Sequence, residues 1–130
     1  MIVLDASALL DLLLGTLTGE SVRDRILPRG EQLCAPHLID IEVAHVLRRY
    51  ERAGEIESRR AQSALADLAD LPMVRYPHAP LLQRIWQLRA NLTGYDAAYV
   101  ALAEILDVPL LTCDAKLASA PGHRARVEVI

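Results

Sequence analysis

The chain has 130 residues, 52% of them hydrophobic and 24% charged, with a formal net charge of −3. We expect a single globular domain over residues 1–130, because this composition excludes a disordered or low-complexity chain. No apolar run approaches the roughly 20 residues of a membrane-spanning helix, and the weak negative charge argues against broad, non-specific adhesion to nucleic acid. The opening sequence MIVLDAS has no basic segment before its apolar run, so we expect no signal peptide and a cytoplasmic location.

Apolar runs and helical periodicity alternate along the whole chain. A strand is predicted where a short apolar run is bounded by turn residues, and a helix where apolar residues recur three or four positions apart. In chain order, the predicted elements are a strand at 1–4, helices at 8–14 and 19–27, a strand at 33–35, helices at 36–56 and 58–71, a strand at 73–74, helices at 80–91 and 95–106, and strands at 108–111 and 127–130. This alternation predicts a three-layer α/β/α sandwich around a central parallel sheet of four or five strands.

Four of the seventeen acidic residues stand out by their position. Asp5 ends the first predicted strand and Asp114 follows the strand at 108–111, so both lie at carboxyl ends of parallel strands, where α/β proteins form their sites. Glu42 and Asp96 share the apolar faces of their predicted helices. Each acid alone also fits a structural role, as a helix cap or turn residue for Asp5, Asp96 and Asp114, and as a rim residue for Glu42.

Four carboxylates that converge would repel one another and would need a positive neutraliser. Lys116, two residues after Asp114, is the only basic side chain in the same local segments. A divalent hard cation, Mg²⁺ or Mn²⁺, is therefore the expected partner, since both ions prefer oxygen ligands.

Four segments carry a family resemblance that covers essentially the whole chain: MIVLDASALLDLL, APHLIDIEVAHVLRR, TGYDAAYVALAEIL and LLTCDAKLA. In size, order and spacing they resemble the motifs of PIN-domain ribonucleases, and specifically those of VapC toxins from VapBC toxin–antitoxin systems. The resemblance implies that the metal ligands and catalytic residues are Asp5, Glu42, Asp96 and Asp114, with Mg²⁺ or Mn²⁺ as the cofactor.

The same resemblance extends to the neighbouring residues, the reaction and the partners. It implies that Ser7 and Thr112 are hydroxyl neighbours of the site that orient a carboxylate or a water. It implies hydrolysis of RNA phosphodiester bonds by metal-activated water, in a structured RNA such as tRNA or rRNA, and leaves open whether one ion or two act. It further implies a homodimer and a cognate VapB-type antitoxin that covers the site.

Other features of the sequence allow more than one interpretation. The leucines of segment 8–14 exceed what a short helix can bury against its own sheet, so a partner groove is a hypothesis there. The arginines between residues 48 and 60 could steer RNA, but a solvated face that is ion-paired with neighbouring glutamates is the favoured interpretation. The side chains expected to have no catalytic role are His37, His45, His78 and His123, the buried Cys34 and Cys113, and the solvent-facing Asp11 and Asp40.

Three alternative functions differ in what they require of the chain. An RNA-processing nuclease of the same family outside a toxin system would use the same site, whereas a non-catalytic module would use the acids only to bind a structural cation. A receiver-type signalling domain also has an acidic Mg²⁺ pocket, but it needs an acceptor aspartate after its middle strand. Here the predicted strand at 73–74 leads into Arg75, Tyr76 and Pro77, which disfavours that class.

Overall fold

The computed structural model describes residues 1–130 and contains one five-stranded sheet with the order β3-β2-β1-β4-β5. Every neighbouring pair of strands is parallel. The strands are β1 (Ile2–Leu4), β2 (Leu33–Pro36), β3 (Met73–Tyr76), β4 (Leu110–Thr112) and β5 (Val127–Val129). The predicted parallel sheet is therefore confirmed, with the segment near the C-terminus as its fifth strand.

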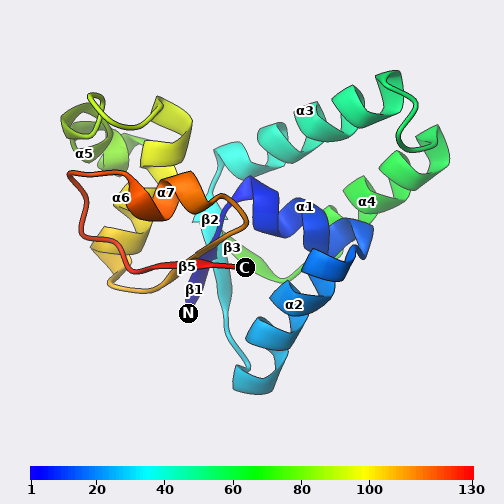
Figure 1. Cartoon of the computed structure of the whole chain (residues 1–130), viewed down its shortest axis with the longest axis horizontal. Coiled ribbons are helices and arrows are strands. Elements are labelled where there is room, and N and C mark those ends of the chain that lie inside the picture. Colours follow the sequence, from blue (N-terminus) through cyan, green and yellow to red (C-terminus); the bar gives the residue numbers. More distant parts are fainter.

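Helices cover both faces of this sheet. They are α1 (Ala6–Leu14), α2 (Leu17–Ile26), α3 (Leu38–Arg52), α4 (Ser58–Asp70), α5 (Leu82–Gln87), α6 (Gly94–Leu106) and α7 (Ala115–Ser119). Figure 1 shows α1 to α4 on one side of the sheet and α5 to α7 on the other, so the predicted three-layer sandwich is confirmed. No helix is both long enough and apolar enough to cross a membrane.

The strand order places a switch point between β1 and β4. From β1 the chain moves outward through β2 to β3, and it then returns across the sheet to β4 and β5. Ligands of open α/β sheets bind beyond the carboxyl ends of the strands at such a point. Asp5 follows β1 and Asp114 follows β4, so the topology places both acids at this edge.

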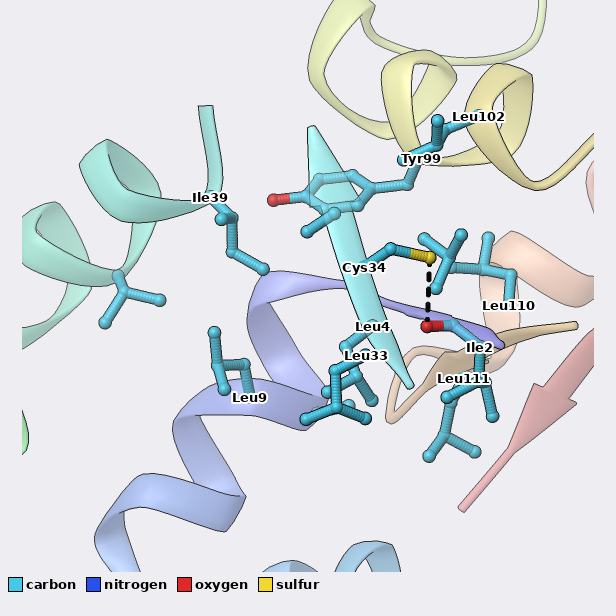
Figure 2. Packing of buried hydrophobic residues seen from close by; sticks show 14 of the residues in the cluster. Ile2, Leu4, Leu9, Leu33, Cys34, Ile39, Tyr99, Leu102, Leu110 and Leu111 are labelled. Carbon is cyan, nitrogen blue, oxygen red and sulfur yellow. Dashed lines mark hydrogen bonds between the residues drawn. The ribbon is translucent and has the colours of Figure 1, made fainter. Parts of the chain in front are cut away.

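The core lies between the sheet and the helices on both faces. Central strands β1 and β4 are buried along their whole length, which explains why their sequences are apolar without alternation. Figure 2 shows how Cys34 packs in this core, with its Sγ donating a hydrogen bond to the Ile2 carbonyl at 3.3 Å. Burial raises the pKa of the Cys34 thiol to about 11, so this cysteine is a structural side chain. Cys113, expected to be buried as well, is only partly so.

Several predicted boundaries differ from the structure for local reasons. Pro36 does not begin a helix but ends β2, where its missing amide costs nothing because β1 pairs with β2 only as far as Cys34. The helix expected at 80–91 is split into a 3₁₀ turn, Ala79–Leu81, and the short α5. Helix α7 was not predicted, because its five residues are too few to show a hydrophobic period.

Candidate metal centre

Asp5 is held in place by three hydrogen bonds. It is the N-cap of α1, where its Oδ1 accepts from the backbone amide of Ala8 at 3.0 Å and from the Ser7 hydroxyl at 2.6 Å. The Thr112 hydroxyl donates to Oδ2. Only 7% of Asp5 is exposed, and this burial raises the pKa of its carboxyl although the three hydrogen bonds oppose the rise. Asp5 therefore caps a helix and also lies at the edge of the sheet where the site is expected.

The hydroxyls of Ser7 and Thr112 connect the ends of β1 and β4. Their oxygens lie 3.3 Å apart, and both donate to the Asp5 carboxylate. The Ser7 Oγ also accepts from the amide of Cys113 at 3.0 Å, and the Thr112 Oγ1 accepts from the amide of Asp114 at 2.9 Å. This network sets the position of the Asp5 carboxylate relative to the backbone that carries Asp114.

Glu42 lies in the second turn of α3 and faces α6. Its Oε1 accepts a hydrogen bond from the hydroxyl of Tyr99 at 2.6 Å. Burial raises the pKa of the Glu42 carboxyl, and the negative charges of Asp96 and Asp5 raise it further, while the bond from Tyr99 opposes the rise. Tyr99 is itself buried, and Figure 2 shows its ring among the apolar core residues with its hydroxyl on the side of α3, where Ile39 lies.

Tyr99 is a residue of the candidate centre that the sequence analysis missed. Its signal was present in the sequence, because Tyr99 follows Asp96 by three residues and so lies on the same helix face. It is also the only residue with a polar side chain in the seven-residue run of α6 that is buried, Ala97 to Ala103. A buried phenol usually has a hydrogen-bond partner, and here that partner is an acid of the site.

Asp96 and Asp114 complete the group in different ways. Asp96 is half-buried in the first turn of α6, and the N-cap of that helix is Thr93, so the structure removes the helix-cap explanation for Asp96. Burial raises the pKa of the Asp96 carboxyl, and the charges of Asp5 and Asp114 raise it further. Asp114 is exposed and is the N-cap of α7, with its Oδ1 accepting from the amide of Lys116 at 3.0 Å.

The negative charges of the four carboxylates act on one another, and no basic side chain of the protein is paired with them. None of the ion pairs in the structure involves any of them. No three His, Cys, Asp or Glu side chains lie close enough together to enclose a metal ion. This open arrangement of oxygen donors fits a hard cation such as Mg²⁺, which keeps several waters and takes only one or two carboxylates from the protein.

Comparison with known proteins identifies the family. Residues 2–122 match the PIN-domain family. This chain is a PIN domain. It is 46% identical over 129 residues to "Ribonuclease VapC1" of Mycobacterium tuberculosis, covering 98% of this PIN domain and 96% of that protein. It is 43% identical over 130 residues to "Ribonuclease VapC12" of the same species, covering 100% and 99% of the two chains.

A solved structure gives the same fold independently. The PIN domain aligns with a TM-score of 0.73 and 14% identity to a chain of VapBC2 from Rickettsia felis, a complex bound to a DNA fragment from its promoter. The alignment covers 99% of this PIN domain and 98% of that chain. The fold is thus shared over the whole chain even where the sequence has diverged.

The structure corrects three expectations about the residues around the site of this PIN domain. Asp40 does not face solvent freely but forms a bidentate ion pair with Arg75, with nitrogen–oxygen distances of 2.7 and 2.9 Å. Asp11 is half-buried and accepts from the Thr16 hydroxyl at 2.8 Å. The expected ion pairs between the arginines of residues 48–60 and their neighbouring glutamates are absent.

His78 and the leucines of α1 contribute to the fold. The Nε2 of His78 accepts from the amide of Leu38 at 2.8 Å and so satisfies one of the free amides at the start of α3. In α1, Leu9, Leu10 and Leu13 are buried within the chain, so this helix buries more of its leucines than its sequence predicted. The apolar surface that stays open is a hollow between α1 and its neighbours, lined by Leu12 and Leu13 of α1 together with Leu27 and Leu71.

Proposed function

We propose that this PIN domain is a metal-dependent endoribonuclease and the toxin of a VapBC-type toxin–antitoxin system. One observation carries the nuclease proposal. The charges of four carboxylates, two that follow β1 and β4 and two on α3 and α6, act on one another, and none of the four forms an ion pair with the protein. Relatives named ribonucleases VapC, which align over nearly the whole chain, support the toxin assignment.

Each residue of the centre has a distinct role in this proposal. Asp5, Glu42, Asp96 and Asp114 would hold Mg²⁺ or Mn²⁺ either directly or through its bound waters, because no three of these side chains lie close enough together to enclose the ion. When bound, the ion would supply the positive charge that activates water and stabilises the attacked phosphate. Ser7 and Thr112 fix the Asp5 carboxylate by donating to its two oxygens. Tyr99 fixes Glu42 in the same way. Side chains held by hydrogen bonds need not reorganise during the reaction, which is the source of electrostatic catalysis.

The decisive experiment is RNA cleavage by the purified protein without antitoxin. Total bacterial RNA is incubated with Mg²⁺ or Mn²⁺, with EDTA, and with the Asp96→Asn variant, while Asp24→Asn on the exposed face of α2 controls for the loss of one carboxylate. We expect cleavage in the presence of metal by the wild-type protein and by Asp24→Asn. Cleavage should disappear in EDTA and in Asp96→Asn.

Two other results would change the proposal. Cleavage that survives both EDTA and Asp96→Asn would contradict the assigned centre. A folded protein that binds Mn²⁺ but cleaves no RNA, including purified tRNA and rRNA, would favour the non-catalytic module. An RNA-processing role outside a toxin system would be favoured if cleavage does not arrest growth when the protein is expressed without an antitoxin.

The proposal includes partners as well as an activity. The RNA substrate would be a structured RNA such as tRNA or rRNA, and the protein would act in the cytoplasm as a homodimer controlled by a VapB-type antitoxin. The complex from Rickettsia felis supports the antitoxin, since that structure is of VapBC2. On this chain, the hollow beside α1, with the exposed Leu27 at its edge, is the surface whose apolar character suits such a partner.

A further inference from the structure

A groove beside α3 leads away from the candidate metal centre. It has a volume of about 450 Å³ and is lined by Ile41, Glu42, His45, Val46, Arg49 and Tyr95. We call it the Tyr95 groove. Glu42 belongs both to the centre and to the groove, and Tyr95 directly precedes Asp96 in the first turn of α6. A molecule whose reactive atoms lie at the centre would therefore extend into this groove.

Tyr95 is an aromatic side chain that the fold does not use. It is 67% exposed and takes no part in the hydrophobic core, whereas Tyr99, one turn later, is 1% exposed. Exposed aromatic rings beside a nuclease centre can stack on unpaired bases, which is the common way in which proteins hold single-stranded nucleic acid. Tyr95 is placed to stack on a base while the adjoining phosphate lies near Asp96.

Arg49 supplies the positive charge that the centre lacks. It lies on the same face of α3 as Glu42, two turns further along, which corresponds to roughly 10 Å along the helix axis. Arg49 is exposed and forms no ion pair with the protein, and its guanidinium carbon lies 5.7 Å from the centre of the Tyr50 ring. A free guanidinium at this distance from the acids suits a phosphate one or two nucleotides from the bond that is cut.

The groove has apolar, acidic and basic side chains, and these favour RNA over a second copy of the chain as its occupant. Ile41 is 74% exposed and lies near Tyr95, so a second copy of the chain is the competing occupant. A copy seated there would cover Glu42 and Arg49 and would take their charges out of water, which is costly without matched partners. Single-stranded RNA brings a phosphate for Arg49 and a base for Tyr95, and it leaves the carboxylates facing the bond to be cut.

The geometry points to a single-stranded nucleotide subsite in the Tyr95 groove, where Tyr95 stacks on an unpaired base next to the scissile phosphate and Arg49 binds the following phosphate. This inference rests on the proposed ribonuclease function and adds to it the residues that hold the nucleotide beside the bond that is cut. It also assigns the specificity-determining contacts to α3 and the start of α6.

The test measures RNA binding separately from cleavage. Fluorescein-labelled single-stranded oligoadenylate is titrated into the Asp96→Asn protein, and its dissociation constant is read by fluorescence anisotropy. Tyr95→Ala, Tyr95→Phe and Arg49→Ala are each combined with Asp96→Asn. Trp86→Ala is the matched control, because Trp86 is also 67% exposed but lies on α5, outside the groove.

We expect Tyr95→Ala to weaken binding by about 5- to 150-fold, the range for loss of one base–aromatic stack, while Tyr95→Phe and Trp86→Ala bind as the parent does. Arg49→Ala should weaken binding and lower its salt dependence, since one phosphate contact is lost. In proteins with an intact Asp96, Tyr95→Ala should raise KM more than it lowers kcat. Double-stranded RNA should compete poorly for the groove.

The outcomes separate this inference from the proposed function. Equal affinities of Tyr95→Ala and Tyr95→Phe would overturn the subsite, even if cleavage by the wild-type protein needs metal. A change of oligomeric state in Tyr95→Ala, measured by light scattering, with unchanged RNA affinity would make the groove an interface between copies. Binding that depends on Tyr95 in a protein that cleaves no RNA would support the subsite while the nuclease proposal fails.

Discussion

The hydroxyl of Tyr99 donates a hydrogen bond of 2.6 Å to the Glu42 carboxylate, joining α6 to α3 across the candidate metal centre. The tyrosine ring is buried in the core, so the position of this acid is coupled to the packing of the fold. The bond also stabilises the charged form of Glu42 against the burial and the like charges that raise its pKa. Tyr99 is therefore a positioning residue that acts on the centre through Glu42.

Tyr99→Phe tests this coupling. The variant keeps the buried ring but removes the donor, so the pKa of the Glu42 carboxyl should rise further above its ordinary value. The acidic limb of the pH–rate profile for RNA cleavage should then move to higher pH, with lower kcat below neutral pH. Because a net hydrogen bond contributes roughly 1 kcal/mol, the variant should stay folded by circular dichroism. An unchanged profile would mean that Tyr99 only fills space.

Thr112→Val should damage both stability and activity. Thr112 is fully buried, and its hydroxyl donates to Asp5 and accepts from the amide of Asp114. Replacement by the isosteric valine leaves buried partners unsatisfied, which costs about 1–3 kcal/mol of unfolding free energy. Urea unfolding measures this loss, and Thr112→Ser is the matched control that keeps the hydroxyl. A valine variant as active and stable as the serine variant would contradict the role of the network.

Metal removal should lower the Tm of the wild-type protein much more than that of Asp96→Asn. In EDTA, Asp96→Asn should have the higher Tm, because it removes one of the carboxylates whose mutual repulsion raises their pKa values. Added Mn²⁺ should raise the Tm of the wild-type protein by mass action and that of Asp96→Asn much less. Thermal unfolding followed by fluorescence reads both effects. Equal Mn²⁺ shifts would argue against Asp96 as a ligand.

Glu104→Gln should destabilise the protein in a pH-dependent manner. The guanidinium of Arg84, bonded to Glu104 at 2.7 Å, holds the pKa of this carboxyl below its ordinary value. A lowered pKa contributes stability that is complete above about pH 4.5 and is lost as the pH falls through the folded-state value. The unfolding free energies of wild type and Glu104→Gln should therefore differ at pH 7, and the difference should shrink as the pH falls below about 4.5. A difference that does not depend on pH would point to packing instead.

Leu27→Asp should weaken antitoxin binding without unfolding the protein. Leu27 is 64% exposed at the hollow beside α1, whereas Leu13 is buried, so a charge at Leu13 would test folding rather than binding. Leu17→Asp is the control, because Leu17 is 84% exposed and lies outside this hollow. Calorimetric titration with the proposed VapB-type antitoxin compares the two variants. Equal affinities would place the antitoxin on another surface.

The sequence by itself determined the class of the fold and the candidate acids. Hydrophobic periodicity is local, so the five strands and the main helices could be predicted from the chain, although the boundary between β2 and α3 was wrongly placed at Pro36. The acids of the candidate centre could be predicted because their positions relative to apolar segments are also local. Asp5 ends an apolar strand, and Asp96 opens an apolar helix, positions that need no knowledge of distant parts of the chain.

The tertiary structure alone decided which groups meet. Tyr99 lies 57 residues from Glu42, and Thr112 lies 107 residues from Asp5, yet each pair shares a hydrogen bond. Local patterns could not show that Arg49 lacks an ion-pair partner or that the leucines of α1 are mostly buried. These properties depend on the strand order and on how α3 and α6 approach the sheet, because hydrogen bonding and burial are decided by distances through space rather than along the chain.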